Sequence, residues 1–278
     1  MQSKFYGDNM KILWITNKPL TAVGLLMLPV LALASIGLVM DPRMIAGAPA
    51  WLKPAKFAIS IAVYSFTFAW IFRYLQEWPR VRAITGWITV ITMILELGII
   101  GAQAARGTLS HFNTRTPLDQ ALFSIMGIAI LVAWGASAAI AIALFRERSL
   151  NSAMGWALRL GMLITVFGSA TGGFMVTPTK AQLKEARITR KLPIAGAHTV
   201  GAPDGGPGIP VTGWSLEHGD LRVPHFLGLH AMQVIPFLAW TLKLKRPGVV
   251  IALSGGYAIL FVALLMQALA GIPLLGGA

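Results

Sequence analysis

Long apolar stretches with few charged residues dominate this chain and decide what it can fold into. A helix needs roughly 20 apolar residues to cross about 30 Å of hydrocarbon. Seven stretches meet that length, at about 20–40, 52–74, 84–106, 118–145, 154–177, 223–243 and 248–273. Only 12% of the residues are charged, whereas a soluble domain carries about 25%. We therefore expect an all-α, polytopic membrane protein with a bundle of seven transmembrane helices.

One connection between these stretches, residues 179–222, is much longer than the others. Its first part, 180–191, is polar and predicts a short helix at the lipid headgroups. Its second part, 201–210, is rich in glycine and proline, which prevents a long helix or strand. Because Ile209, Val211 and Trp214 interleave with these turns, we expect a folded extracytoplasmic cap rather than a flexible linker. No domain boundary is evident, so residues 1–278 are predicted to form one transmembrane domain.

The basic residues are divided unequally between the two sides of the bundle. Twelve of the 23 lysines and arginines lie in segments on the side of the amino terminus, and five lie in the short connections of the other side. The positive-inside rule then predicts a bacterial inner-membrane protein with a cytoplasmic amino terminus and an extracytoplasmic carboxyl terminus. The net charge of +13 is split among many loops, which favours a lipid bilayer rather than a nucleic acid as partner. The chain has no cysteine, which excludes disulfides and thiolate sites.

All five histidines fall at the predicted extracytoplasmic ends of the stretches, namely His111, His198, His218, His225 and His230. Histidine is the commonest metal ligand and titrates nearest to neutral pH. On a regular helix, His230 would lie ~7.5 Å deeper than His225, and the two rings would point about 140° apart. These two residues are therefore a poor pair for one metal ion on one helix.

Glu96 lies near the middle of the third stretch, where an ionisable group costs ~2.5–3.5 kcal/mol on insertion and by default suggests a function. Gln103 follows on roughly the same helix face, and His111 lies near the outer end of that face. We expect Glu96 to handle protons or to orient a ligand; the alternative is a structural, hydrogen-bonded glutamate. Lys56 either extends to the headgroups or points into the bundle toward Glu96 or an anionic ligand. The small residues at 168–173 favour close helix packing, with room for a flat cofactor as the alternative.

Three functions are compatible with this pattern, and the first is b-type haem binding with electron transfer. A haem needs one or two neutral imidazoles, an apolar slot and cations near its propionates. The candidate ligands are His111 and either His225 or His230, and the candidate anion partners are Arg106 and Arg222. The protein would then be a component of a membrane oxidoreductase with a redox partner.

The second function is that of a metal-dependent membrane enzyme, such as a zinc-type hydrolase or a copper enzyme. Its candidate ligands are His111, His225 and His230, together with Asp220 or Glu217. Either Glu96 or Asp119 would transfer protons. The third function is that of a proton or solute carrier, or of an accessory membrane subunit, in which Glu96 lines the path. The sequence leaves these alternatives open.

Four strings resemble a family of bacterial multi-pass inner-membrane proteins of unassigned function. They are W-x-K-P-x-K-F at 51–57, S-H-F-N at 110–113, H-T-V-G at 198–201 and G-D-L-R-x-P-H-F-x-G-L-H at 219–230. The resemblance covers most of the chain. It implies the membrane class and carries no activity with it.

Overall fold

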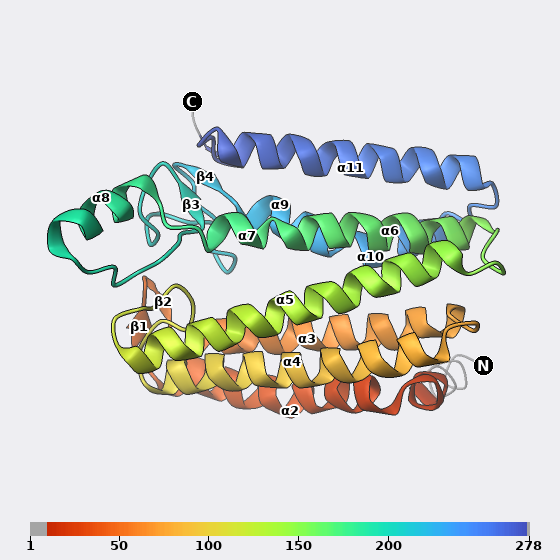
Figure 1. Ribbon diagram of the computed structural model, residues 1–278, viewed down its shortest axis with the longest axis horizontal. Helices are drawn as coiled ribbons and strands as arrows, with labels where there is room; N and C mark the ends of the chain where they lie inside the picture. The colour runs from red at the N-terminus through yellow and green to blue at the C-terminus, as the bar shows by residue number, and fades with distance from the viewer. Residues whose placement is uncertain (1–9, 277–278) are drawn as a thin grey trace.

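Long helices run side by side along the whole molecule in the computed structural model, which describes residues 10–276 (Figure 1). Six helical segments of this part are long and apolar enough to cross a membrane. They are α2 (Lys18–Met40), α3 (Leu52–Ile71) with η1 (Phe72–Tyr74), α4 (Pro79–Ala105), α5 (Pro117–Arg146), α6 (Ala153–Ala170) with α7 (Gly172–Met175), and α11 (Pro247–Leu269). A helical, multi-pass membrane protein is therefore the class that the structure supports.

The predicted stretch at 223–243 departs from the expected single helix. It forms two short helices, α9 (Arg222–Leu229) and α10 (Ala231–Thr241), which are separated at His230. Seven uninterrupted spans are thus not found in the described residues. Position 230 adopts φ −87° and ψ 0°, outside the helical range. The hydropathy of the stretch could not reveal this break, because apolar residues continue on both sides of it.

Side chains from other helices satisfy the backbone groups that the break sets free. The Thr165 hydroxyl of α6 accepts a hydrogen bond from the Met232 N–H at 3.0 Å and donates to the Leu229 carbonyl at 3.3 Å. The Tyr257 hydroxyl of α11 donates to the Leu227 carbonyl at 2.6 Å. A broken helix is tolerated at membrane depth when neighbouring groups replace the lost backbone bonds in this way.

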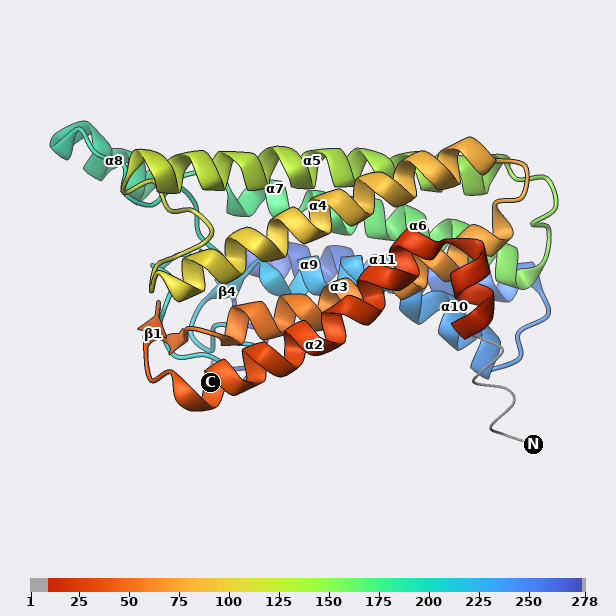
Figure 2. The same ribbon diagram turned by 90° about the horizontal axis from the view of Figure 1, so that it is seen from below.

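The helices form two groups, with α2, α3 and α4 in one and α6, α9, α10 and α11 in the other (Figure 1). The second view shows α2 and α3 running side by side (Figure 2). Helix α5 runs obliquely between the groups and meets α6 where α5 ends (Figure 1). We call the end of the bundle where α3, α5 and α9 begin the histidine end, because His111, His198, His218 and His225 lie there. The other end is called the opposite end.

Arg159 holds the turn between α5 and α6 at the opposite end. Its side chain is buried and donates from Nε to the Leu144 carbonyl at 2.9 Å, from Nη1 to the Leu150 carbonyl at 2.7 Å, and from Nη2 to the Glu147 carbonyl at 2.8 Å. The last carbonyls of a helix have no partner within the helix, and a cation there is also favoured by the helix dipole. One arginine therefore both terminates α5 and attaches α6 to it.

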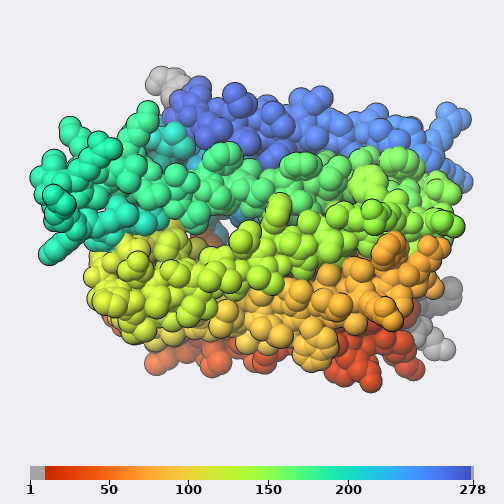
Figure 3. Space-filling model, viewed as in Figure 1, coloured from red at the N-terminus to blue at the C-terminus, as the bar shows by residue number. Residues whose placement is uncertain are grey.

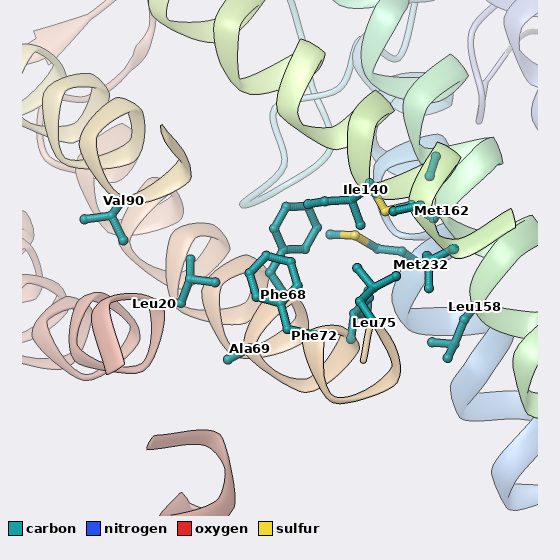
Figure 4. Close-up of a cluster of buried hydrophobic side chains, with 14 of the residues drawn as sticks. Leu20, Phe68, Ala69, Phe72, Leu75, Val90, Ile140, Leu158, Met162 and Met232 are labelled. Carbon is teal, nitrogen blue, oxygen red and sulfur yellow. The ribbon is translucent and has the colours of Figure 1, made fainter. Parts of the chain in front are cut away.

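The main apolar core joins the two helix groups (Figure 4), and most of its side chains lie in the half of the bundle toward the opposite end. Its largest side chains are completely or almost completely buried; among them are Phe68, Phe72, Leu75, Ile140, Leu144, Leu158, Met162 and Met232. Each such side chain contributes about 1.5–3 kcal/mol when it leaves water. This core is therefore closely packed, although Thr85 and Thr89 of α4 are also buried in the same half of the bundle.

The long connection at the histidine end is structured. It begins with α8 (Lys180–Thr189), the helix predicted at 180–191, which a capping box between Thr179 and Gln182 starts. Further on, β3 (Thr199–Val200) pairs antiparallel with β4 (Gly219–Asp220), and an isolated bridge joins Gly208 to Ser215. A second small hairpin, β1 (Met44–Ile45) with β2 (Ala48–Pro49), connects α2 to α3.

Candidate functional site

Glu96 lies on α4 with only 1% of its surface exposed, and its carboxylate meets the ring of His111. The distance from Glu96 Oε1 to His111 Nε2 is 3.3 Å. The other oxygen, Oε2, is buried and has no hydrogen-bond partner among residues 10–276. A buried polar atom without a partner costs about 1–3 kcal/mol. The structure thus brings together two of the predicted site residues and leaves one carboxylate oxygen free to bind something else.

His111 connects this carboxylate to the histidine end. Its side chain keeps 23% of its surface exposed, and its Nδ1 lies 3.1 Å from the Ser110 hydroxyl. Burial lowers the pKa of His111 well below its usual value, and the positive charge of Lys53 lowers it further. The ring is therefore neutral at pH 7. Its Nε2 faces Glu96 and its Nδ1 faces Ser110, so beside an ionised Glu96 the neutral ring carries its hydrogen on Nε2.

Lys53, rather than Lys56, is the cation of this site. Its ammonium group lies 6.0 Å from the centre of the Phe57 ring, which in turn lies 6.0 Å from the His111 ring. Lys56 instead donates from Nζ to the Thr212 carbonyl at 3.2 Å. The interpretation that Lys56 points toward Glu96 is therefore wrong, because this lysine binds the long connection to the start of α3.

His198 forms a second polar unit with Asp204 in the long connection. Its Nδ1 lies 2.9 Å from Asp204 Oδ2, and the same carboxylate accepts from the backbone N–H groups of His198 and Thr199. Burial lowers the pKa of His198, although the Asp204 charge opposes that shift. Burial raises the pKa of Asp204, but the hydrogen bonds from His198 and Thr199 outweigh it and hold the pKa well below its usual range.

Arg106 and Arg222, which were predicted as partners for an anionic cofactor, are already neutralised. Arg106 Nη1 lies 2.8 Å from Asp119 Oδ1, and Arg222 Nη2 lies 2.6 Å from Asp220 Oδ2. Both carboxylates are buried, and Gln103 also donates to Asp119 at 2.9 Å. The structure therefore does not support these arginines as free anion sites. The sequence contained a signal for the Arg222–Asp220 pair, because Asp220 lies only two residues before Arg222.

The remaining two predicted ligands have separate surroundings. His225 Nδ1 lies 3.1 Å from the Gly168 carbonyl and 3.2 Å from the Thr171 hydroxyl. His230 lies at the break between α9 and α10, with its ring 4.2 Å from that of Phe226. Residues 10–276 contain no group of three histidine, aspartate or glutamate side chains arranged to hold a metal ion. The predicted metal set of His111, His225 and His230 is thus not assembled.

Gly168, the first glycine of the small-residue cluster at 168–173, packs against another helix, whereas nothing lies within 4 Å of a Cβ placed on Gly173. A Cβ placed on Gly168 would lie 2.5 Å from the carbonyl carbon of Gly228 on α9. The two glycines therefore let the backbones approach more closely than any larger residues would allow. The favoured interpretation of this cluster, close packing, agrees with the structure, and the backbone of α9 occupies the place of a flat cofactor beside Gly168.

Further polar contacts lie within the membrane-spanning part of the bundle, and sequence reasoning missed them. The Tyr64 and Ser137 hydroxyls are 2.8 Å apart, and Gln233 donates from Nε2 to the Thr67 hydroxyl at 3.3 Å. The Gln233 carbonyl oxygen makes no hydrogen bond of standard geometry within the described residues, although the ring of His230 lies near it. Ser65 Oγ is likewise buried without a partner in this part of the chain. Single hydroxyl groups in an apolar helix carry no recognisable sequence signal.

The surface is hollowed between α5 and α7, in the half of the molecule nearer the histidine end (Figure 3). Toward the opposite end α5 and α6 are in contact and the hollow closes.

Comparison of the chain with protein-family models, with curated proteins and with solved structures finds no match. The site is therefore interpreted from its own chemistry.

Proposed function

We propose that this protein is a membrane carrier that takes up protons, alone or with a solute, at Glu96 from the histidine end. The observation that carries the proposal is the Glu96 carboxylate itself, with one oxygen on a neutral imidazole and the other unpartnered in the described residues. Ionisable groups at membrane depth are costly, and they typically mark proton relays or ion pathways. In this proposal α9 and α10 together form the seventh crossing, and residues 179–222 cover an extracytoplasmic entrance.

His111 supplies the route to Glu96. Its Nδ1 takes a proton from the partly exposed side and its Nε2 releases one to Glu96, so that the ring returns to neutrality as the other tautomer. One proton has then moved inward and one carboxylate has become a neutral acid. The Ser110 hydroxyl assists because it can reverse its role from donor to acceptor.

The half of the bundle toward the opposite end determines the side from which Glu96 takes up protons. Polar side chains reach Tyr64 and Gln233, beyond which Phe68, Phe72 and Leu75 belong to the apolar core. In this proposal the apolar core hinders the passage of water and protons, although buried Thr85, Thr89 and Thr92 continue the face of Glu96 along α4. Glu96 is then reached from the histidine end. Release on the other side requires a rearrangement. In many transporters discontinuous helices such as the α9–α10 pair form the binding site, and one helix bundle moves against the other around it.

The first test measures protonation directly. Infrared difference spectra of the purified protein between pH 5 and pH 9 should contain the carbonyl stretch of a protonated carboxylic acid, and Glu96→Gln should remove it. Glu217→Gln, which alters an exposed glutamate of the long connection, is the matched control and should retain the band. A band that survives in Glu96→Gln would refute Glu96 as the proton acceptor.

The second test measures transport. Vesicles with the reconstituted protein should dissipate an imposed pH gradient, Glu96→Gln should abolish this flux, and His111→Asn should slow it. Equal flux in Glu96→Gln and in the parent protein would contradict the carrier function.

Haem binding is the second candidate, and one observation favours it. Because His225 directs Nδ1 to the Gly168 carbonyl, its Nε2 is left as the acceptor, which is how ligating histidines are oriented. His111, whose two ring nitrogens are both engaged, is the poorer ligand. Protein purified from haem-supplied cells should then show a Soret band that disappears in His225→Ala. A colourless preparation would refute this candidate and, with it, a redox partner.

A further inference from the structure

A groove of about 600 Å³ opens at the opposite end of the bundle, whereas His111 lies at the histidine end. Its apolar wall consists of Met154 from the start of α6, Ala239 and Trp240 from the end of α10, and Leu244. Its polar rim carries Lys243 and Lys245, both exposed, from the link between α10 and α11. The groove thus joins an apolar wall to two positive charges.

The position of the groove relates it to the membrane surface. It lies where α10 ends and α6 begins, at the ends of membrane-crossing segments. Trp240 is 67% exposed and its ring lies 6.2 Å from that of the exposed Phe237. Exposed tryptophan at a helix end is typical of the boundary between hydrocarbon and headgroups. An occupant of this groove therefore has its apolar part beside Trp240 and its charged part beside the lysines.

The charge of this end determines the sign of the occupant. The connections that surround it carry Arg73, Arg80, Arg82, Arg146, Arg148, Lys243, Lys245 and Arg246 against Glu77 and Glu147. Glu147 is fully buried and accepts from the Glu77 N–H and the Ser149 hydroxyl. No carboxylate therefore balances the two lysines within the groove lining.

We propose that this groove is a binding site for an anionic phospholipid. The phosphate lies between Lys243 and Lys245, and an acyl chain follows Trp240 and Met154. Basic pockets at helix ends beside the bilayer bind such headgroups. The inference is independent of proton uptake at Glu96.

The backbone at Lys243 gives a variant that should fold. Lys243 adopts φ 52°, in the left-handed region that asparagine tolerates much better than lysine does. Lys243→Asn should therefore keep or improve the turn while it removes the charge. Lys245→Gln removes the second charge without a change of backbone preference.

The experiment is native mass spectrometry of the purified full chain, titrated with phosphatidylglycerol or phosphatidylcholine of the same acyl chains. We expect the parent protein to retain phosphatidylglycerol in preference to phosphatidylcholine. The double variant Lys243→Asn/Lys245→Gln should lose about fivefold in affinity for each lysine, or roughly 25-fold in all. The matched control is Arg73→Gln/Arg80→Gln, which removes two exposed charges from another connection at the same end, and it should bind as the parent does.

Three results would overturn the proposal. Equal retention of the two lipids would mean that the headgroup is not recognised. An equal loss in the control variant would mean that the general charge of this end, and not the groove, attracts the lipid. Displacement of the lipid by glycerol phosphate at equal concentration would identify a site for a soluble phosphate instead.

Discussion

The contact between Gly168 on α6 and Gly228 on α9 gives the sharpest prediction about the packing of this bundle. An added Cβ at position 168 would lie 2.5 Å from the Gly228 carbonyl carbon, whereas carbon atoms pack at about 3.5–4.0 Å. Gly168→Ala must therefore separate the two helices by at least ~1 Å. Both partners are backbone, so no side chain can rotate away, and we expect a loss of about 1–3 kcal/mol in the free energy of unfolding.

Gly135→Ala on α5 is the matched control, because nothing lies within 4 Å of the added methyl group. The same chemical change there should be neutral or stabilising by up to ~1 kcal/mol, since alanine favours a helix more than glycine does. Equilibrium unfolding of both variants in mixed detergent micelles measures the difference. Equal stabilities for the two variants would refute the close contact between α6 and α9.

The double variant sharpens the test. Once Gly168→Ala has moved the helices apart, adding Gly228→Ala should lower the free energy of unfolding by less than Gly228→Ala does in the parent protein. A thermodynamic cycle over the four proteins should then show a coupling free energy of at least ~0.5 kcal/mol. Strict additivity would mean that the two glycines do not share one contact.

Three further predictions follow from buried polar groups. Arg159→Met should lower the free energy of unfolding by ~3 kcal/mol, because one carbonyl in the last turn of α5 and two in the connection after it lose their donor. Exposed Arg148→Met should have little effect in the same unfolding assay. Tyr64→Phe should cost ~1 kcal/mol through the lost hydrogen bond to Ser137, and the loss should vanish in a Ser137→Ala background. The pKa of His111 is lower in the folded state than in the unfolded state, so the unfolded state binds more protons as the pH falls. The free energy of unfolding should therefore be highest above about pH 6.5 and should fall below it; unfolding curves for His111→Asn should show a weaker decline, and an unchanged slope would contradict the burial of this ring.

Hydropathy alone predicted the membrane class and the positions of six long helices, because apolar length is a local property of the sequence. The small residues at 168–173 indicated the close packing at Gly168, and the polar segment 180–191 indicated the short helix after Thr179. The break at His230 was not predictable in this way, since it depends on Thr165 and Tyr257, which are far away in the sequence.

The site was predicted only in part. The depth of Glu96 and the face shared with His111 follow from helix periodicity, and the structure joins these two residues. The pairing of Arg106 with Asp119 and the engagement of Lys56 with Thr212 were not foreseen. Each of these contacts depends on how a loop folds back onto the helices. The helical periodicity of the sequence gives no information about the path of a loop. The same applies to the three imidazoles, which were expected to converge and instead have separate partners.

Thr165 has a consequence for recognising relatives of this chain. Because one hydroxyl serves both sides of the interruption at His230, only serine can replace Thr165 without leaving an amide or carbonyl there unpartnered. Replacement of Thr165 by a residue without a hydroxyl group should therefore destabilise the protein more than the loss of one hydroxyl group usually does. In a distant homologue, a hydroxyl residue midway along α6 would indicate an interrupted partner helix even where the surrounding letters have diverged.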